Sequence, residues 1–557
     1  MSDTYTVGDL VAEFLQACGV ETAFGVISVH NIPMLDGIGR RNAIRFVTAR
    51  GEAGAGHMAD AWARARNELG VLITSTGPGA ANAVGALVEA RFAGTPLLHL
   101  TGQTATGNIG RDQGTVHEVA DQLGMLASVS KTAHRISSAE TAFAILSQAA
   151  AQALTPPMGP VSVEIPIDIQ RTPVTRPAEL DQFQLPIPTA VAPSATQLDL
   201  IADILASSKR PLLWCGSGAR YAGEAVARLA DMGVPVVTSW NGRGVLPEDH
   251  AMSLRGMNGT GTPLIEDWFK TVDLMLVAGS RLRGHETMDM TIGLPERRVQ
   301  IDVDPLANGR TYDCEQFICG DASLVLHELA DRLEGRLKPE DGYAAEIADL
   351  KARTIAAYKD MLGAYATFPD DLREAMPRDT LFARDLTMSH STWGHRLFPL
   401  YDPRSNIYPV GAAIGPGLAM GIGAAIAAAP GQKVLAMCGD GGFNMGIAEL
   451  PTAAQEKTDV VFLVMNDAGY GVIRHIQDTM YGGRQYYGDV QSPDFKALAG
   501  ANGLPYWRVS KAPDLGNAMK EALAVAGPTL VEVDMTAIGP YPRYFAPPPH
   551  AGETDKT

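Results

Sequence analysis

Short apolar runs that stop at glycine or at a polar residue alternate with longer amphipathic segments over most of the chain. A buried parallel strand reads as a continuous apolar run, whereas a helix packed on a sheet repeats its apolar residues every three or four positions. The alternation predicts an α/β protein whose mostly parallel sheets are flanked by helices. Strands are predicted at residues 21–26, 44–47, 211–215, 434–438 and 460–465.

The alternating pattern falls into three stretches of domain size, which suits a chain of 557 residues. The segment 171–194 is rich in proline and lacks helical periodicity, as linkers do. The predicted parts are a first domain at 1–170, the linker at 171–194, a middle domain at 195–335, a charged helical connector at 336–365, a third domain at 366–540 and a tail at 541–557.

Polar residues follow two consecutive apolar runs in the third domain. Asp440 stands in a glycine-rich turn after the first run, and Asn466 ends the second. A helix between two parallel strands would bring both residues to the carboxyl edge of neighbouring strands. Oxygen ligands beside glycine-rich backbone suit a Mg²⁺ ion that holds a diphosphate. The sequence therefore predicts such a site at this edge.

A single carboxylate, Glu52, marks a predicted strand-to-helix junction in the first domain, among alanines and glycines. A carboxyl group confined there would be partly desolvated, which favours sharing its proton with a ligand. The alternative is a first-turn glutamate that is favoured by the helix dipole. Taken by itself, the residue favours the first-turn interpretation.

Composition narrows the classes of function. The formal net charge is −17 and is spread along the chain, so neither a nucleic-acid partner nor an anionic membrane is expected. The five cysteines show no paired spacing and indicate reduced thiols in a cytoplasmic protein. The long apolar run at 411–429 is rich in glycine, which favours a buried helix over a membrane span.

Several segments together resemble the thiamine-diphosphate enzymes. Gly439-Asp440-Gly441, followed by Asn466 and then Gly469-Tyr470-Gly471, is similar to the signature of that family. Residues 49–64, 74–82, 96–103 and 159–168 resemble further elements of its pyrimidine-binding domain, in the family's order. The order pyrimidine-binding, middle, diphosphate-binding points to the group of acetolactate synthases, benzoylformate decarboxylases and benzaldehyde lyases.

The resemblance implies thiamine diphosphate and Mg²⁺ as cofactors. It implies that Glu52 activates the cofactor through its aminopyrimidine ring, and that Ile414 holds the cofactor in a bent shape. Asp440, Asn466 and the carbonyl of Ala468 would bind the Mg²⁺ ion. Further cofactor-binding residues implied in the same way are Pro78, Asn82, His390, Ser391, Gly411, Gly439, Gly441, Gly442, Gly469 and Tyr470.

The resemblance leaves a nucleotide in the middle domain open. Residues 211–218 run from a strand into a glycine turn, a shape that often cradles a phosphate. Acetolactate synthases bind FAD beside an R-F-D-D-R stretch, whereas residues 281–285 of this chain read R-L-R-G-H. Neither FAD nor ADP is therefore implied or excluded.

Two histidines are the main candidates for residues that face the substrate. His30 and His117 lie where relatives place residues that face the substrate, and each could move a proton near neutral pH. A loop histidine bonded to backbone is an equal alternative for each. Gln103, His390 and Tyr481 are weaker candidates.

The implied activity is that of an acetolactate-synthase-like enzyme that decarboxylates 2-oxo acids, carboligates them, or does both. The alternative is a lyase or carboligase that acts on 2-hydroxy ketones or diketones without decarboxylation, as benzaldehyde lyase does. A cofactor-binding subunit without turnover is a third hypothesis. In the family the glutamate and the Mg²⁺ loop come from different subunits, which implies a homodimer with shared active sites, commonly doubled to a homotetramer.

Overall fold

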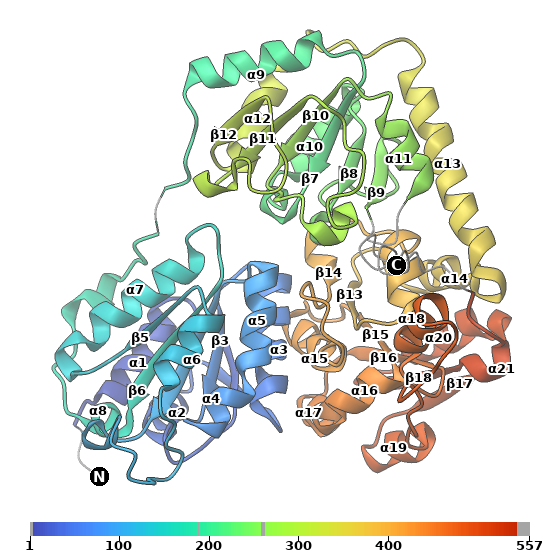
Figure 1. Ribbon diagram of the computed structural model, residues 1–557. Coiled ribbons are helices and arrows are strands. Elements are labelled where there is room, and N and C mark those ends of the chain that lie inside the picture. The colour runs from blue at the N-terminus through green and yellow to red at the C-terminus, as the bar shows by residue number, and fades with distance from the viewer. Residues whose placement is uncertain (1–3, 188, 258–261, 543–557) are drawn as a thin grey trace. The chain divides into compact units, whose positions relative to one another are not determined.

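The computed structural model describes residues 4–187, 189–257 and 262–542. Three six-stranded sheets follow one another along the chain, and helices flank each of them (Figure 1). Parallel strand pairs occur in all three sheets, and the predicted fold class is confirmed. Most of the predicted tail at 541–557 lies outside the described residues.

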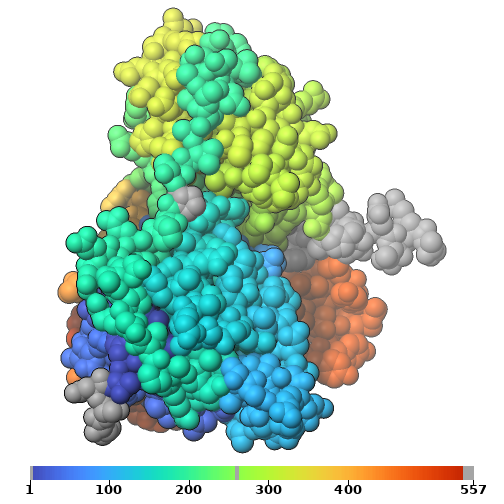
Figure 2. Space-filling model, turned by 90° about the vertical axis from the view of Figure 1, so that its left-hand side faces the viewer, coloured from blue at the N-terminus to red at the C-terminus, as the bar shows by residue number. Residues whose placement is uncertain are grey.

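The first sheet has the strand order β2-β1-β3-β4-β6-β5. Its core contains the apolar face of helix α1 (Val7–Ala17), which begins at the N-cap Thr6 and packs beside helix α7 (Ala142–Leu154). Figure 2 shows the surface of this domain, where residues of about 100–190 cover the face turned to the viewer. The other elements are β1 (Thr22–Gly25), α2 (Ile32–Arg41), β2 (Arg45–Thr48), α3 (Glu52–Arg66), β3 (Gly70–Thr74), α4 (Pro78–Asn82), α5 (Val84–Ala93), β4 (Leu97–Gln103), α6 (Gln122–Val129), β5 (Thr132–Arg135), β6 (Pro160–Pro166) and α8 (Ile167–Arg171).

The second sheet has the order β12-β11-β10-β7-β8-β9, with β9 at one edge. Its central strands are fully buried, as their apolar runs predict. Helix α13 packs against β9 and so covers that edge. The elements are α9 (Ala195–Ser207), β7 (Pro211–Cys215), α10 (Gly223–Asp231), β8 (Val236–Thr238), β9 (Ser253–Gly256), α11 (Pro263–Phe269), β10 (Leu274–Ala278), β11 (Arg298–Asp302), β12 (Gln316–Cys319), α12 (Ala322–Leu333) and α13 (Tyr343–Leu362).

The third sheet has the order β14-β13-β15-β16-β18-β17, so the two strands predicted from their apolar runs, β15 and β16, are neighbours. The elements are α14 (Phe368–Ala375), β13 (Leu381–Arg384), β14 (Asn406–Ile407), α15 (Gly417–Ala427), β15 (Val434–Gly439), α16 (Asp440–Gly446), α17 (Leu450–Glu456), β16 (Val460–Asn466), α18 (Gly471–Met480), α19 (Phe495–Ala501), β17 (Tyr506–Val509), α20 (Leu515–Ala524), β18 (Thr529–Asp534) and α21 (Met535–Ile538).

The chain forms two compact units whose boundaries cut across the sequence. The first unit joins Met1–Pro188 with Ile407–Val434 and Met445–Val460, and the remainder forms the second. In the first unit, helix α15 packs on helix α3. A side chain at Gly423 would lie 2.2 Å from the carbonyl oxygen of Met58, so only glycine allows this approach. The apolar run at 411–429 thus supplies a buried helix, and no helix among the described residues is long and apolar enough to cross a membrane.

Candidate functional site

Asp440 and Asn466 meet at the carboxyl edge of the third sheet, within the second unit. Asp440 begins α16 directly after β15, and Asn466 ends β16. The backbone N–H of Asp467 donates to Asp440 Oδ1 at 3.3 Å, and Ser492 Oγ donates to Asp440 Oδ2 at 2.7 Å. Asn466 is fixed by Glu532, which accepts its amide N–H at 2.8 Å. The predicted juxtaposition of the two strand ends is therefore present in the fold.

The backbone of the two loops that carry Asp440 and Asn466 is closely packed. A side chain at Gly441 would lie 2.7 Å from the ring of Tyr470, and one at Gly469 would lie 2.4 Å from the carbonyl oxygen of Gly488. Ala468 adopts the left-handed conformation, with a φ of 59°, and its N–H donates to Asn466 Oδ1 at 3.1 Å. A side chain is therefore disfavoured at Gly441 and Gly469, two of the glycines that were predicted to approach an anionic group.

Two carboxylates lie in contact at this edge. Burial and the charge of Asp440 raise the pKa of Asp467 to about 7, although Arg474 lies 3.2 Å from Asp467 Oδ2 and opposes the shift. A divalent cation would relieve the repulsion between the two carboxylates. Among the described residues no three His, Cys, Asp or Glu side chains gather as a metal site, but the predicted set needs only one carboxylate, one amide and one carbonyl. The oxygen donors fit Mg²⁺.

Asp467, Arg474 and Ser492 were not singled out as site residues from the sequence. Arg474 donates to the carbonyl oxygen of Asp467 at 2.6 Å and pairs with Asp489 at 3.0 Å, which ties the loop after β16 to α18. The position of Asp467 directly after Asn466 is a signal that could have identified it. Ser492 gives no such signal, because it lies in a loop with no recognisable pattern.

Glu52 is the first residue of α3 in the first unit, and its side chain is buried. Asn82 donates to Glu52 Oε2 at 3.1 Å, so two residues predicted to bind the cofactor are in contact. A side chain at Gly79 would lie 2.7 Å from Glu52 Oε1, which leaves the carboxylate a small neighbour on that side. The carboxylate is therefore confined, as the junction predicts.

A second glutamate, Glu449, accepts hydrogen bonds from the backbone where α3 begins. Its Oε1 accepts from the N–H groups of Arg50, at 3.1 Å, and of Gly51, at 3.0 Å, and its Oε2 accepts from Thr452 Oγ1 at 2.6 Å. Glu449 thus supplies an anion at the helix N-terminus, the role that the alternative interpretation gave to Glu52. Sequence reasoning missed Glu449, because 397 positions separate it from Glu52.

The segment that carries Gly411 and Ile414 is fixed by buried charged residues of the first unit. Glu89 accepts from the backbone N–H groups of Val410 and Gly411, the latter at 2.9 Å, and Arg64 donates to the carbonyl oxygen of Tyr408 at 2.8 Å. Burial raises the pKa of Glu89 to about 7. Ile414 follows this anchored stretch and is half-buried.

The structure brings the two candidate histidines together. The ring centroids of His30 and His117 lie 5.1 Å apart, and Ser75 Oγ lies 3.4 Å from His117 Nδ1. Burial lowers the pKa of His30, and the neighbouring His117 adds to the shift. Side chains at Gly77 and Gly102 would lie 2.2 and 2.3 Å from the carbonyl oxygens of His117 and His30, respectively, so glycines allow both loops to pass.

The weaker candidates have different surroundings. Gln103 is buried and donates to Glu164 at 3.2 Å, whereas Tyr481 is exposed. His390 and Ser391 lie in the helical turn His390–Gly394 of the second unit. The His390 ring packs 3.9 Å from that of His395 and 5.9 Å from that of Trp240, and burial lowers the pKa of His390 strongly.

The glycine turn after β7 has a packing role. A side chain at Gly216 would lie 2.2 Å from the carbonyl oxygen of Gly279, and one at Gly218 would lie 2.8 Å from the Cα atom of Gly279. The glycines allow the loops after β7 and β10 to touch. The turn is thus explained without a nucleotide, and nothing in this packing favours FAD or ADP.

Comparisons with known proteins cover all three domains. Residues 5–125 match the model of the thiamine pyrophosphate enzyme N-terminal TPP binding domain, residues 198–329 its central domain, and residues 387–533 its C-terminal TPP binding domain.

Relatives match over nearly the whole chain. A probable 2-ketoarginine decarboxylase of Pseudomonas aeruginosa is 30% identical over 537 residues, which cover 95% of this chain and 94% of the relative. A probable acetolactate synthase large subunit of Methanocaldococcus jannaschii is 29% identical, over 94% of this chain and 91% of the relative. The acetolactate synthase catalytic subunit of Saccharomyces cerevisiae is 28% identical, over 95% of this chain and 80% of the relative. The chain therefore belongs to the thiamine-pyrophosphate-dependent enzymes, in their acetolactate-synthase-like group.

Proposed function

We propose that this enzyme is Mg²⁺-dependent and decarboxylates a 2-oxo acid, with or without transfer of the remaining fragment to a second carbonyl compound. The observation that carries the proposal is the confined Glu52 carboxylate, held by Asn82 at the first turn of α3. The name of one relative, a probable 2-ketoarginine decarboxylase, gives the same class of substrate.

Thiamine diphosphate supplies a carbon nucleophile and an electron sink when it is bound. Asp440, Asn466 and the carbonyl of Ala468 would hold the Mg²⁺ ion, and the N–H groups of the loop at 439–442 would receive the diphosphate. Glu52 would share a proton with a ring nitrogen of the cofactor, because its carboxylate is buried and anchored on one oxygen by Asn82. Ile414 would support the bent cofactor from the segment that Glu89 anchors.

His30 and His117 would move protons at the substrate. The lowered pKa of His30 keeps its ring neutral near pH 7, so that it accepts a proton. The contact of His117 Nδ1 with Ser75 Oγ fixes the orientation of the second ring. A neutral His30 ring beside the substrate would accept a proton from a hydroxyl group of the bound substrate or of water.

The alternative is lysis or ligation of 2-hydroxy ketones without loss of CO₂, and the paired histidines favour it as much as they favour decarboxylation. An assay of CO₂ release from a panel of 2-oxo acids, run beside cleavage of 2-hydroxy ketones, separates the two activities. Cleavage of a hydroxy ketone with no CO₂ from any 2-oxo acid would refute the proposed reaction. Turnover of neither class by protein that retains cofactor would favour the subunit without activity.

The proposal extends to the assembly and the location of the enzyme. We infer a homodimer with shared active sites, doubled to a homotetramer, because the family resemblance assigns the glutamate and the Mg²⁺ loop to different subunits. Light scattering of the purified protein tests this inference, and a monomer that turns over substrate would contradict it. The five cysteines are free thiols, which supports a cytoplasmic location.

A further inference from the structure

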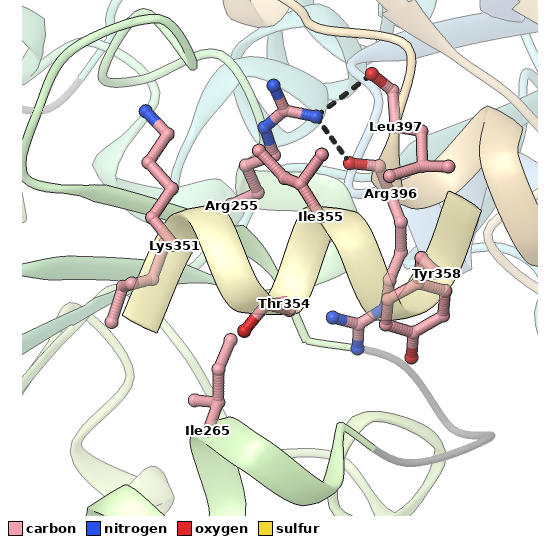
Figure 3. Close-up of a pocket in the computed structure, with 9 residues that line it drawn as sticks. Arg255, Ile265, Lys351, Thr354, Ile355, Tyr358, Arg396 and Leu397 are labelled. Carbon is pink, nitrogen blue, oxygen red and sulfur yellow. Dashed lines mark hydrogen bonds between the residues drawn. The ribbon is translucent and has the colours of Figure 1, made fainter. Parts of the chain in front are cut away.

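Two charged side chains each hold two consecutive backbone groups of a neighbouring loop. In the second unit, Arg255 of β9 lines a mainly apolar cavity beside α13, and its Nη1 donates to the carbonyl oxygens of Arg396 and Leu397 at 2.8 and 2.9 Å (Figure 3). In the first unit, Glu89 of α5 accepts from the backbone N–H groups at 410–411. An arginine stays charged throughout the neutral range, whereas a carboxylate can take up a proton. The contact made by Glu89 is therefore the one that pH can change.

The two oxygens of Glu89 bind two different N–H groups. Oε1 accepts from Val410, and Oε2 accepts from Gly411 at 2.9 Å. The residue is buried, with an exposed fraction of 2%. A side chain at Gly411 would lie 2.9 Å from Glu89 Oε2 and 3.0 Å from the ring of Phe92, so the backbone passes directly beside the carboxylate. Hydrogen bonds to an ionised acceptor are roughly twice as strong as those to a neutral one, so a proton on Glu89 would weaken this contact.

The charged groups that act on Glu89 come from helix α3. Asp60 repels its carboxylate, and Arg64 attracts it. The charge of Arg64 is shared, because its Nη1 lies 3.4 Å from Asp60 Oδ2 and donates to the carbonyl oxygen of Tyr408 at 2.8 Å. Burial lowers the pKa of His57, a neighbour of Asp60 on the same helix, to about 4, so this ring is neutral near pH 7. From Tyr408 to the end of α15 the chain has no further ionisable side chain. Burial and the charge of Asp60 raise the pKa of Glu89 to about 7.

The residues that Glu89 holds precede a strained turn. Ala412 adopts the left-handed conformation, with a φ of 65°, and its N–H donates to the carbonyl oxygen of Pro409 at 3.0 Å. A non-glycine residue in this conformation is strained and persists where its surroundings fix it. The residues at 411–413 are exposed, so side-chain packing contributes little there. Glu89 thus fixes the backbone directly before the turn that leads to Ile414.

We propose that Glu89 is a positioning residue for the cofactor, and that uptake of one proton from the solvent by its carboxylate releases the segment at 410–414 and weakens the binding of thiamine diphosphate. The inference rests on the proposed place of Ile414 beside the cofactor. A group with a pKa of about 7 is about 90% ionised at pH 8 and about 10% at pH 6. If only the ionised form holds the segment for the cofactor, the apparent dissociation constant rises about 10-fold between these pH values.

Binding of thiamine diphosphate to the full chain, freed of cofactor and supplied with excess Mg²⁺, tests the inference by calorimetry at pH 6 and pH 8. We expect Glu89→Gln to bind about 10-fold less tightly at pH 8 and to lose a factor of about 10 from the pH dependence, because glutamine is uncharged at both pH values. Glu140→Gln is the matched control, since it makes the same change at an exposed residue of the first unit. It should bind as the unaltered protein does. Ionisation of the cofactor itself affects all three proteins alike.

Amide hydrogen exchange of the unaltered, cofactor-free chain measures the segment directly and decides if Glu89→Gln fails to fold. After correction for the intrinsic effect of pH, the amides at 410–411 should be less protected at pH 6 than at pH 8. Equal protection at both pH values overturns the proposal, as does an equal pH dependence of binding in Glu89→Gln and the unaltered protein. Ile414→Ala tests the proposed function separately: undiminished cofactor binding would refute the place given to Ile414, whatever the exchange at 410–411.

Discussion

Replacement of Glu449 by alanine should damage both the stability of the first unit and catalysis. The carboxylate accepts the N–H groups of Arg50 and Gly51 and the hydroxyl of Thr452. Each hydrogen bond to a charged group contributes about 1.5–3 kcal/mol, and water can enter the vacated space in part. We therefore expect Glu449→Ala to lower the free energy of unfolding by about 2–4 kcal/mol.

The expected loss of catalysis follows from the place of the lost hydrogen bond, because Gly51 directly precedes Glu52 in the chain. A displacement of about 1 Å at a catalytic group costs roughly 100-fold in rate. Glu449→Gln should recover most of the activity, since Oε1 accepts from both backbone N–H groups and glutamine keeps an oxygen at that place, although the Arg50 N–H loses its second acceptor, Oε2. The measurements are urea unfolding of the cofactor-loaded protein and kcat on the best 2-oxo acid.

The control is Glu68→Ala, which removes a half-buried glutamate just beyond the other end of α3 that pairs with Arg66 at the surface. Its unfolding and kcat should stay close to those of the unaltered protein. The reasoning is refuted if Glu449→Ala unfolds at the same urea concentration as Glu68→Ala and keeps its kcat. A loss that glutamine does not recover would show that charge, and not the two backbone bonds, decides the geometry.

Three further substitutions test separate features. Glu52→Gln should lower kcat by about 10²–10⁴-fold with little change in unfolding midpoint, because glutamine can still accept from Asn82; unchanged turnover would contradict the role of Glu52. Burial lowers the pKa of His99 to about 3 and of His57 to about 4, so the unfolded chain binds more protons and stability should fall as pH falls below about 6.5; midpoints measured from pH 7.5 to 5 should fall less steeply for His99→Gln. Gly423→Ala would place its side chain 2.2 Å from the Met58 carbonyl oxygen and should lower the unfolding midpoint, whereas Gly39→Ala, in a helix position with open space, should leave it equal or higher.

Of the five strands predicted from apolar runs, only the one at 44–47 lies at the edge of a sheet. The buried strands β7, β15 and β16 read as continuous apolar runs, and the spacing of Asp440 and Asn466 placed them at neighbouring strand ends, as the sheet order confirms. Five of the strands that were not predicted from their own residues lie at sheet edges, where half-buried positions break the apolar run. They are β5, β9, β12, β14 and β17.

The surroundings of Glu52 show which features local sequence patterns can predict and which they cannot. Adjacent residues predict that Glu52 lies at a strand-to-helix junction, and in the structure helix α3 begins at this residue. Glu449 cannot be predicted in the same way, because a carboxylate that accepts backbone N–H groups from residues 398 and 399 positions away leaves no periodicity at either end. Gly54 is the local residue that reflects this contact, since a side chain there would lie 2.3 Å from Glu449 Oε1.

The first compact unit is built from segments that lie far apart in the sequence, and this has a consequence for biosynthesis. Its N-terminal part ends at Pro188, and its remaining segments begin at Ile407. At about 5–20 residues per second, a ribosome needs roughly 10–45 s to make the intervening stretch. During that interval the face of α3 that later receives α15 has no partner, so the nascent chain presents a site for chaperones or for misassembly with a neighbouring chain. Expression of the first 188 residues alone would make this transient state permanent.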